Sequence, residues 1–511
     1  MGQTPSQRIG LIAGVVLAIG LQALPVPDGL DREAWLLASL ALLMASWWAT
    51  EAIPIAATAL IPIALFPLLG IASTGASTAP YASPIVMLLL GGFVIALSIE
   101  RWNLHTRIAL NVVAGFGSRP AALVAGFMLA SALLSMWISN TATTLMMIPI
   151  ALRVAAEVER DSAGTRLFAP ALALGIAYSA SVGGMATPVG TPTNLIGLGF
   201  LQNEFGRTLD FASWMGVGLP VVALIIPAGW FVLTRWAFPL KAADNSTGAH
   251  DLVVRELAGL GRMTTPELRV AALFATVAVL WMGASLPGFL LSWIPGVPSG
   301  DWAWGWNPLL SWIGARLDLP VDIRLGNTQI AVMGALAAFL VPSGCRIEGR
   351  GTALMAWEDT ARLPWNVIIL FGGGLSLAAA LTATGLADWL GAQMHFLTDL
   401  PAPVLILIIV AVVVFLTELT SNVATVTGFM PVLGIIAGEA GLPAEQLIVP
   451  VAIAGSAAFM LPVATAPNAI VYASGAVTQG QMIRAGVRLN LFAVLVIAGI
   501  GSLAALLGFG G

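Results

Sequence analysis

Apolar runs long enough to cross a bilayer recur from one end of the chain to the other. A spanning helix needs about 20 mostly apolar residues. Eleven stretches fit this requirement, at residues 9–25, 34–50, 52–70, 84–100, 170–200, 213–236, 268–290, 327–343, 365–390, 447–475 and 488–508. The pattern therefore predicts an all-α polytopic membrane protein with about eleven transmembrane helices.

Two further apolar stretches, 120–150 and 402–436, are each broken near the middle by polar residues. At about 30 residues each is too long for a single span, so we interpret both as re-entrant hairpins. Irregular backbone at membrane depth is tolerated only where it is buried in protein or lines a cavity. The two hairpin tips therefore mark the functional interior.

The composition supports a membrane protein and excludes several other classes. Of 511 residues, 58% are hydrophobic and only 9% are charged, whereas soluble domains carry about 25% charged residues. A net charge of −4 argues against nucleic-acid binding, which favours basic surfaces. The single Cys345 excludes a disulfide within the chain and a multi-cysteine metal site. No metal motif or nucleophile–base pair occurs at membrane depth, so we do not expect an enzyme.

The distribution of basic residues predicts the orientation of the chain in the bilayer. With a cytoplasmic N-terminus and hairpins that return to their own side, 17 of the 21 Lys and Arg residues are cytoplasmic. The four others are Arg32, Arg207, Arg316 and Arg324. The positive-inside rule then favours an extracytoplasmic C-terminus, and we expect the protein in the inner (plasma) membrane of the cell. It also predicts a cytoplasmic first hairpin and an extracytoplasmic second hairpin.

Short motifs recur in the same order in both parts of the chain. Residues 139–143 (SNTAT) return 282 positions later as 421–425 (SNVAT), and residues 188–191 (PVGT) return 274 positions later as 462–465 (PVAT). We therefore predict a first repeat half over 1–244, a cytoplasmic linker over 245–267 and a second half over 268–511. Hairpins that enter from opposite faces would make the repeats inverted, a recurring plan of secondary transporters with the site at the repeat interface. The tryptophan-rich stretch 291–326 is interpreted as an interfacial loop.

Both hairpin tips carry clusters of neutral polar side chains. Their hydroxyl, amide and freed carbonyl oxygens suit Na⁺, and the hydroxyls and amides can donate to a carboxylate. Helix N-termini at the breaks add partial positive charge. The alternative is that the hydroxyls bond back to their own helices. The clusters are Ser135, Ser139, Asn140, Thr141, Thr143 and Thr144 in the first tip, and Thr417, Thr420, Ser421, Asn422, Thr425 and Thr427 in the second.

A second pair of motifs, residues 187–194 and 462–468, contains prolines on both sides of a Gly or Ala. Proline removes an amide donor and clashes with the preceding turn. We therefore predict a mid-span unwound segment in each half, with carbonyls that can coordinate a cation. A simple proline kink is the alternative.

Few ionisable residues lie within the predicted membrane region. Glu51 either caps a helix that begins at Pro54 or binds a proton or cation. Glu418 either has a structural or gating role or binds a proton or cation. No Lys or Arg occurs in the tips or the broken spans. An anion there would be held by neutral donors, helix ends and bound cations, so anion and cation should bind together.

The chain resembles the divalent anion:sodium symporter family, which comprises di- and tricarboxylate carriers. The resemblance covers nearly the whole sequence. It is carried by WATEAIP at 48–54, SMWISNTATTLMMIP at 135–149, GGMATPVGTPTN at 183–194, PWNVIILFGGGLSLA at 364–378, TELTSNVATVTGFMP at 417–431 and SAAFMLPVATAPNAIVYASG at 456–475. It implies a homodimer with scaffold and transport domains and elevator-type alternating access.

Residue by residue, the resemblance implies at least two Na⁺ sites around one anion site. One Na⁺ would bind Ser135, Ser139, Asn140 and the Gly190 carbonyl, and the other Thr417, Asn422 and the Ala464 carbonyl. The substrate carboxylates would contact Ser139, Asn140, Thr141, Thr191, Ser421, Asn422 and Thr465. Val423 replaces the usual Thr, and Thr193 and Ala466 stand where the family usually has Pro.

The leading functional hypothesis is Na⁺-coupled import of a C4-dicarboxylate such as succinate, fumarate or malate. The alternatives on the same scaffold are a sodium-independent dicarboxylate or anion exchanger, and a carrier of citrate or sulfate. A channel is disfavoured because the sequence has no repeated charged ring. The expected partners are the dicarboxylate anion, Na⁺, the lipid bilayer and a second copy of the chain.

Overall fold

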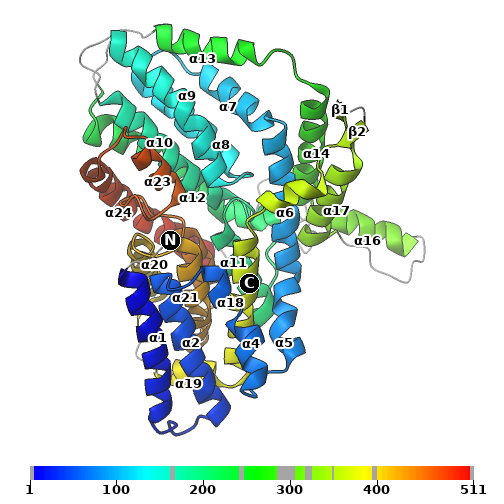
Figure 1. Cartoon of the computed structure of the whole chain (residues 1–511), viewed down its shortest axis with the longest axis vertical. Coiled ribbons are helices and arrows are strands. Elements are labelled where there is room, and N and C mark those ends of the chain that lie inside the picture. Colours follow the sequence, from blue (N-terminus) through cyan, green and yellow to red (C-terminus); the bar gives the residue numbers. More distant parts are fainter. Residues whose placement is uncertain are drawn as a thin grey trace.

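The computed structural model describes residues 5–161, 167–240, 247–284, 305–316, 325–347, 350–393 and 400–506. These residues are mostly helical, as the apolar pattern predicts (Figure 1). Eight of the described helices are long and apolar enough to cross a membrane. They are Thr74–Arg101, Asn140–Glu159, Phe168–Ala186, Phe211–Ala237, Thr265–Met282, Trp365–Ala383, Asn422–Glu439 and Gln479–Ala504. The protein is therefore a multi-pass membrane protein.

The helices of the first part of the chain often begin at a proline. Pro84, Pro120 and Pro192 are the first residues of α6, α8 and α11, where the missing N–H costs no helical hydrogen bond. The helices are α1 (Pro5–Ala23), α2 (Arg32–Thr50), α3 (Ile55–Thr58), α4 (Ile61–Leu68), α5 (Thr74–Thr78), α6 (Pro84–Arg101), α7 (Leu104–Ala114), α8 (Pro120–Ser135), α9 (Asn140–Asp161), α10 (Phe168–Gly183), α11 (Pro192–Phe205) and α12 (Phe211–Phe231). Shorter helical turns are η1 (Ala79–Ala82), η2 (Gly184–Ala186) and the π-helical η3 (Val232–Ala237).

The second part of the chain adds helices and one short β-ribbon. Its helices are α13 (Thr247–Gly259), α14 (Thr265–Met282), α16 (Trp306–Arg316), α17 (Asn327–Leu340), η4 (Trp357–Arg362), α18 (Trp365–Ala383), α19 (Leu386–Gln393), α20 (Ala402–Leu416), α21 (Asn422–Glu439), α22 (Glu445–Ala454), α23 (Ala466–Ala473) and α24 (Gln479–Leu506). The ribbon pairs β1 (Pro342–Ile347) with β2 (Arg350–Ala353) in antiparallel fashion.

Two features differ from the sequence-based expectation, and a third adds detail within the predicted linker. The β-ribbon corrects the all-α prediction, and Gly344 at φ +86° occupies the register irregularity between Pro342 and Arg346 in its first strand. The predicted span 52–70 forms two short helices, α3 and α4. The polar linker 245–267 contains α13, which packs against α7 and α9. Most of the predicted interfacial loop 291–326 lies outside the described residues, which include only residues 305–316, 325 and 326 of it.

The four predicted interruptions are confirmed. Residues 136–139 separate α8 from α9, and residues 417–421 separate α20 from α21. Residues 184–191, which include η2, separate α10 from α11, and residues 455–465 separate α22 from α23. Each half of the sequence therefore contributes one helix–break–helix unit and one broken span.

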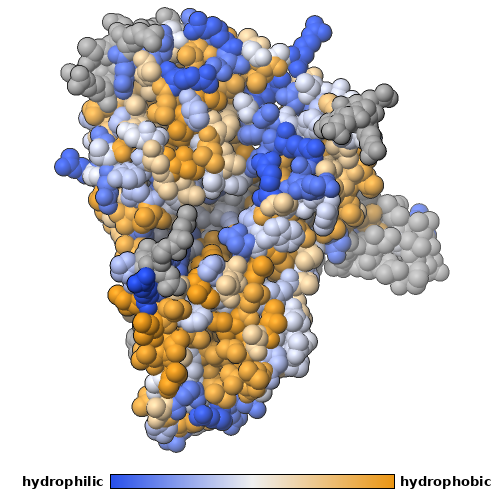
Figure 2. Space-filling view, viewed as in Figure 1, coloured by the Kyte–Doolittle hydropathy of each residue, from blue (hydrophilic) through white to orange (hydrophobic). Residues whose placement is uncertain are grey.

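Packing brings these interrupted elements to the centre of the molecule. Almost every residue of α10 is buried, and α10 packs against α8, α9 and α12. Helix α24 packs against α12, α20 and α22. Figure 2 shows apolar side chains over the lower helices and a hollow near mid-height. Exposed apolar side chains of α1, including Ile9, Ile12 and Val16, suit contact with lipid.

Candidate functional site

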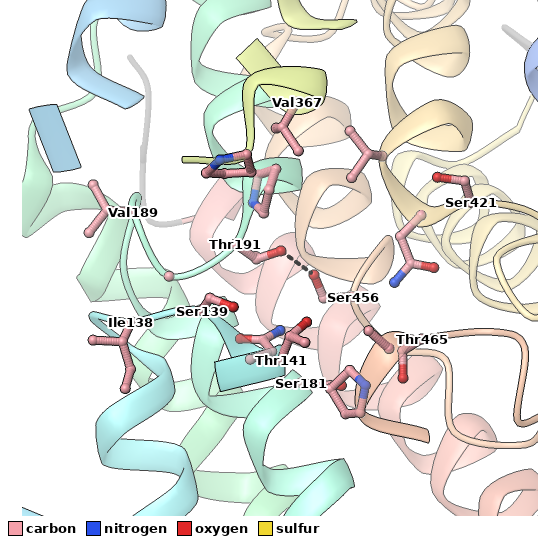
Figure 3. A pocket seen from close by; sticks show the side chains of 18 of the residues that line it. Ile138, Ser139, Thr141, Ser181, Val189, Thr191, Val367, Ser421, Ser456 and Thr465 are labelled. Carbon is pink, nitrogen blue, oxygen red and sulfur yellow. Dashed lines mark hydrogen bonds between the residues drawn. The ribbon is translucent and has the colours of Figure 1, made fainter. Parts of the chain in front are cut away.

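The four interruptions converge on one cavity of about 390 Å³. Figure 3 shows Ser139 and Thr141 on one side of it, Ser421 and Thr465 on the other, and Thr191 next to Ser456. The first residues of α9, α11, α21 and α23 all line the cavity, so four helix N-termini meet there. All seven sequence-predicted substrate residues line it, namely Ser139, Asn140, Thr141, Thr191, Ser421, Asn422 and Thr465.

Three of the lining hydroxyls cap the helices that begin at the cavity. Ser139 Oγ accepts from the Ala142 N–H at 3.3 Å, and Ser421 Oγ accepts from the Ala424 N–H at 3.5 Å. Thr465 Oγ1 accepts from the Asn468 N–H at 3.1 Å. An N-cap hydroxyl that only accepts keeps its own hydrogen for another acceptor. These three groups can therefore still donate to an anion in the cavity.

The first tip gathers oxygen atoms in the arrangement expected for a cation. Ser135 Oγ is fully buried and donates to Asn140 Oδ1 at 2.6 Å. A Cβ built on Gly184 would lie 2.9 Å from Asn140 Oδ1 and 3.0 Å from the Gly190 carbonyl oxygen. The two oxygens therefore border one small space that only glycine leaves open. Four predicted sodium ligands, Ser135, Ser139, Asn140 and Gly190, come from this tip and the adjacent unwound segment.

The second tip provides a comparable set of oxygen atoms. Asn422 Oδ1 is buried and has no hydrogen-bond partner among the described residues. The buried Thr417 donates its hydroxyl hydrogen to the Val414 carbonyl at 3.0 Å, which leaves the oxygen lone pairs free. Asn422 and Ala464 both line the cavity. A buried amide oxygen without a hydrogen-bond partner is unfavourable by itself. These oxygen atoms therefore fit the role of ligands to a bound cation.

The two unwound segments are held by the same asparagine contacts. Asn194 Nδ2 donates to the carbonyls of Gly184 at 2.9 Å and Thr187 at 2.7 Å. Asn468 Nδ2 donates to the carbonyls of Ala458 at 3.2 Å and Leu461 at 3.0 Å. In each segment the acceptors lie ten and seven residues before the asparagine. The sequence repeat at a spacing of 274 residues therefore has a counterpart in hydrogen bonding.

The cavity is electrostatically unusual for an anion site. Among the described residues that line it, none is Lys or Arg, and Glu51 is the one ionisable side chain. Glu51 ends α2 in the left-handed region at φ 47°. The helix-cap interpretation of Glu51 is wrong, because α3 begins after Pro54 without a side-chain cap. Positive potential in the cavity therefore comes from the four helix N-termini.

One lining residue, Ser456, was not among the sequence-predicted site residues. Its hydroxyl donates to Thr191 Oγ1 at 3.3 Å (Figure 3). It also lies 3.0 Å from Thr193 Oγ1. Thr193 is one of the positions that depart from the family pattern, and this hydrogen bond gives its hydroxyl a role. The signal that could have identified Ser456 is its place at the start of the motif at 456–475.

Comparison with known proteins assigns the chain to a family. The family model described as the sodium:sulfate symporter transmembrane region matches residues 6–509. The chain belongs to this family. A sodium-dependent dicarboxylate transporter of Staphylococcus saprophyticus is 35% identical over 497 residues, which cover 96% of this chain and 90% of that protein. The Staphylococcus aureus protein of the same name is 36% identical over 499 residues, with the same coverage. This member of the sodium:sulfate symporter family is a membrane transporter and not an enzyme.

Solved structures show the same general fold at low sequence identity. Neisseria gonorrhoeae MtrF, described in terms of antimetabolite efflux pumps, aligns with a TM-score of 0.55 and 15% identity over 99% of this chain and 96% of its own. The Alcanivorax borkumensis YdaH transporter aligns with a TM-score of 0.52 and 16% identity over 94% of this chain and 99% of its own. Both support a transporter fold for this symporter-family chain.

Proposed function

We propose that the chain imports dicarboxylates by Na⁺-coupled secondary active transport, with C4 acids such as succinate, fumarate and malate as substrates. The relatives that are 35–36% identical are named sodium-dependent dicarboxylate transporters. The observation that carries the proposal is the cavity at which four helix N-termini meet. Each N-terminus contributes about +0.5 elementary charge, which suits a dianion in a site without a lining Lys or Arg.

Bound sodium ions would add further positive charge at the site. The first ion is held by Ser135, Ser139, Asn140 and the Gly190 carbonyl, where the Ser135–Asn140 contact and the space at Gly184 favour a cation. The second is held by Thr417, Asn422 and the Ala464 carbonyl, where the Asn422 oxygen lacks a partner.

The substrate lies between the two hairpin tips. Ser139, Asn140 and Thr141 donate to one carboxylate, and Ser421 and Asn422 donate to the other. The N-cap residues Thr191 and Thr465 complete the site. Ser139, Asn140 and Asn422 contact both an ion and the substrate, so cation and anion binding reinforce each other.

Transport follows an elevator-type mechanism in a homodimer, with two inverted repeat halves over 1–244 and 268–511. About eleven spans and two re-entrant hairpins place the N-terminus in the cytoplasm and the C-terminus outside. The matching asparagine contacts in the two unwound segments support a duplicated architecture. The distribution of Lys and Arg supports the orientation.

A transport assay with purified protein in liposomes tests this function. We expect [¹⁴C]succinate uptake to require an inward Na⁺ gradient and to be inhibited by fumarate and malate. Uptake that requires internal succinate and proceeds without Na⁺ would identify an exchanger instead. Because the family description names sulfate, [³⁵S]sulfate and [¹⁴C]citrate uptake are measured in parallel. Faster transport of either anion than of succinate would refute the C4-dicarboxylate assignment.

A further inference from the structure

Helix α10 presents to the cavity one buried hydroxyl that has no hydrogen-bond partner. Ser181 lines the cavity and is 1% exposed, and its Oγ forms no hydrogen bond with any described residue. A hydroxyl within a helix often donates to a carbonyl three or four residues earlier, as Thr144 Oγ1 does to the Asn140 carbonyl at 2.9 Å. Ser181 makes no such bond, so its hydroxyl hydrogen has no acceptor among the described residues.

The position of Ser181 brings it to the first hairpin tip. It precedes Gly184 by three residues where α10 continues directly into η2, so the two positions share one helix face. A Cβ built on Gly184 would lie 2.9 Å from Asn140 Oδ1. Figure 3 shows Ser181 in the same lower part of the cavity as Thr141 and Thr465. Helix α10 packs against both α9 and α23, the helices that begin beside these two threonines.

A bound anion suits this hydroxyl better than a bound cation. A hydroxyl has one hydrogen to donate and two lone pairs, and a buried polar group without a partner is costly. A sodium ion would use a lone pair and leave the hydrogen without an acceptor, whereas a carboxylate oxygen accepts that hydrogen. Because the described lining residues include no Lys or Arg, each neutral donor carries a larger share of anion binding.

We propose that Ser181 is a further substrate-binding residue, an assignment that rests on the proposed dicarboxylate transport. Its hydroxyl donates to the substrate carboxylate that lies at the first tip. The seven substrate residues predicted from the sequence lie at helix N-termini, whereas Ser181 lies in the last turn of α10. Almost every residue of α10 is buried, so this donor is held in place before the substrate arrives.

Equilibrium binding of [¹⁴C]succinate to the purified full-length protein in detergent tests this assignment. The NaCl concentration is one that saturates sodium binding in each variant, as measured by ²²Na⁺ binding without succinate. We expect Ser181→Ala to raise the Kd for succinate at least tenfold, equivalent to about 1.4 kcal/mol, with ²²Na⁺ binding as in the wild type. Weaker ²²Na⁺ binding together with a wild-type Kd for succinate at saturating NaCl would make Ser181 a sodium ligand and overturn the assignment.

Ser179→Ala is the matched control on the same helix. Ser179 is also fully buried, and its Oγ also has no partner among the described residues. It is not one of the residues that line the cavity, and it lies about 200° around the helix from Ser181. This variant should bind succinate with wild-type affinity. Equal losses of affinity in the two variants would overturn the assignment, because they would show a general effect of changing α10.

The melting temperature (Tm) separates substrate binding from structural support. Ser181→Ala removes a buried hydroxyl that has no partner, so its Tm without ligand should equal or exceed that of the wild type. The rise in Tm that succinate induces should be smaller than in the wild type. A lower Tm without ligand, combined with an unchanged rise on adding succinate, would show a purely structural role.

The outcomes also distinguish this assignment from the proposed function. Folded Ser181→Ala protein with an unchanged Kd for succinate would refute the role of Ser181 and leave dicarboxylate transport intact. A wild-type protein that binds no succinate would refute both.

Discussion

The substitution Gly184→Ala should disable the first sodium site with little change elsewhere. The added Cβ would lie 2.9 Å from Asn140 Oδ1 and 3.0 Å from the Gly190 carbonyl oxygen. Ordinary carbon–oxygen contacts begin at about 3.3 Å, so these oxygens must retreat by about 0.3–0.4 Å. Both belong to the proposed ligand set of one ion. Their displacement should weaken Na⁺ binding at this site at least tenfold, or about 1.4 kcal/mol.

The sodium dependence of succinate uptake in liposomes measures this effect, and the melting temperature shows whether the variant is folded. Overpacking by one methyl group costs about 1–3 kcal/mol, so a modest fall in Tm is expected. Gly428→Ala in α21 is the matched control, because its Cβ would meet no atom within 4 Å. Folded Gly184→Ala protein with a wild-type sodium dependence would refute the placement of the first site.

Four further substitutions test other contacts of the site. Asn140→Ala and Asn422→Ala should each abolish Na⁺-driven succinate uptake in protein that remains folded by size-exclusion chromatography, and wild-type rates in either would refute the ligand assignment. Asn194→Ala should lower Tm, because the buried Gly184 carbonyl loses its side-chain donor at about 1–3 kcal/mol, whereas the Thr187 carbonyl keeps the Gly190 N–H as a donor. An unchanged Tm would contradict a role of Asn194 in holding the unwound segment. Ser456→Ala should raise the KM for succinate about two- to tenfold with kcat retained, because Thr191 loses a hydrogen bond of about 0.5–1.5 kcal/mol. Ser456→Thr should restore KM, and a KM that is unaffected in Ser456→Ala would remove Ser456 from the site.

The features that follow from local sequence patterns could be predicted well. Prolines and polar residues inside apolar runs predicted all four interruptions, since each breaks a helix through its own backbone chemistry. The repeated motifs indicated which side chains would form one site. All seven predicted substrate residues line one cavity. Their roles in binding remain predictions.

Some features that were missed depend on contacts between distant segments, and one is a local strand pairing. Ser456 reaches Thr191 across 265 residues, and no local pattern encodes that contact. The β-ribbon after α17 consists of polar residues without strict alternation, so its pairing is not visible in the sequence. The hydrogen bonds of Glu418 could not be predicted either, because its backbone donors come from residues 459–461, about 40 residues later in the sequence.

The two halves of the chain share the hydrogen bonds in their unwound segments but differ in the residues at their hairpin tips. Asn194 and Asn468 make equivalent contacts, so both unwound segments have the same internal support. The two tips differ at equivalent positions: the first has Met136 and Thr141, where the second has Glu418 and Val423. Thr141 and Val423 both line the cavity, and the additional hydroxyl of Thr141 makes its two ends unequal. An asymmetric acid such as malate would therefore bind in one preferred orientation, with its hydroxyl-bearing end toward Thr141.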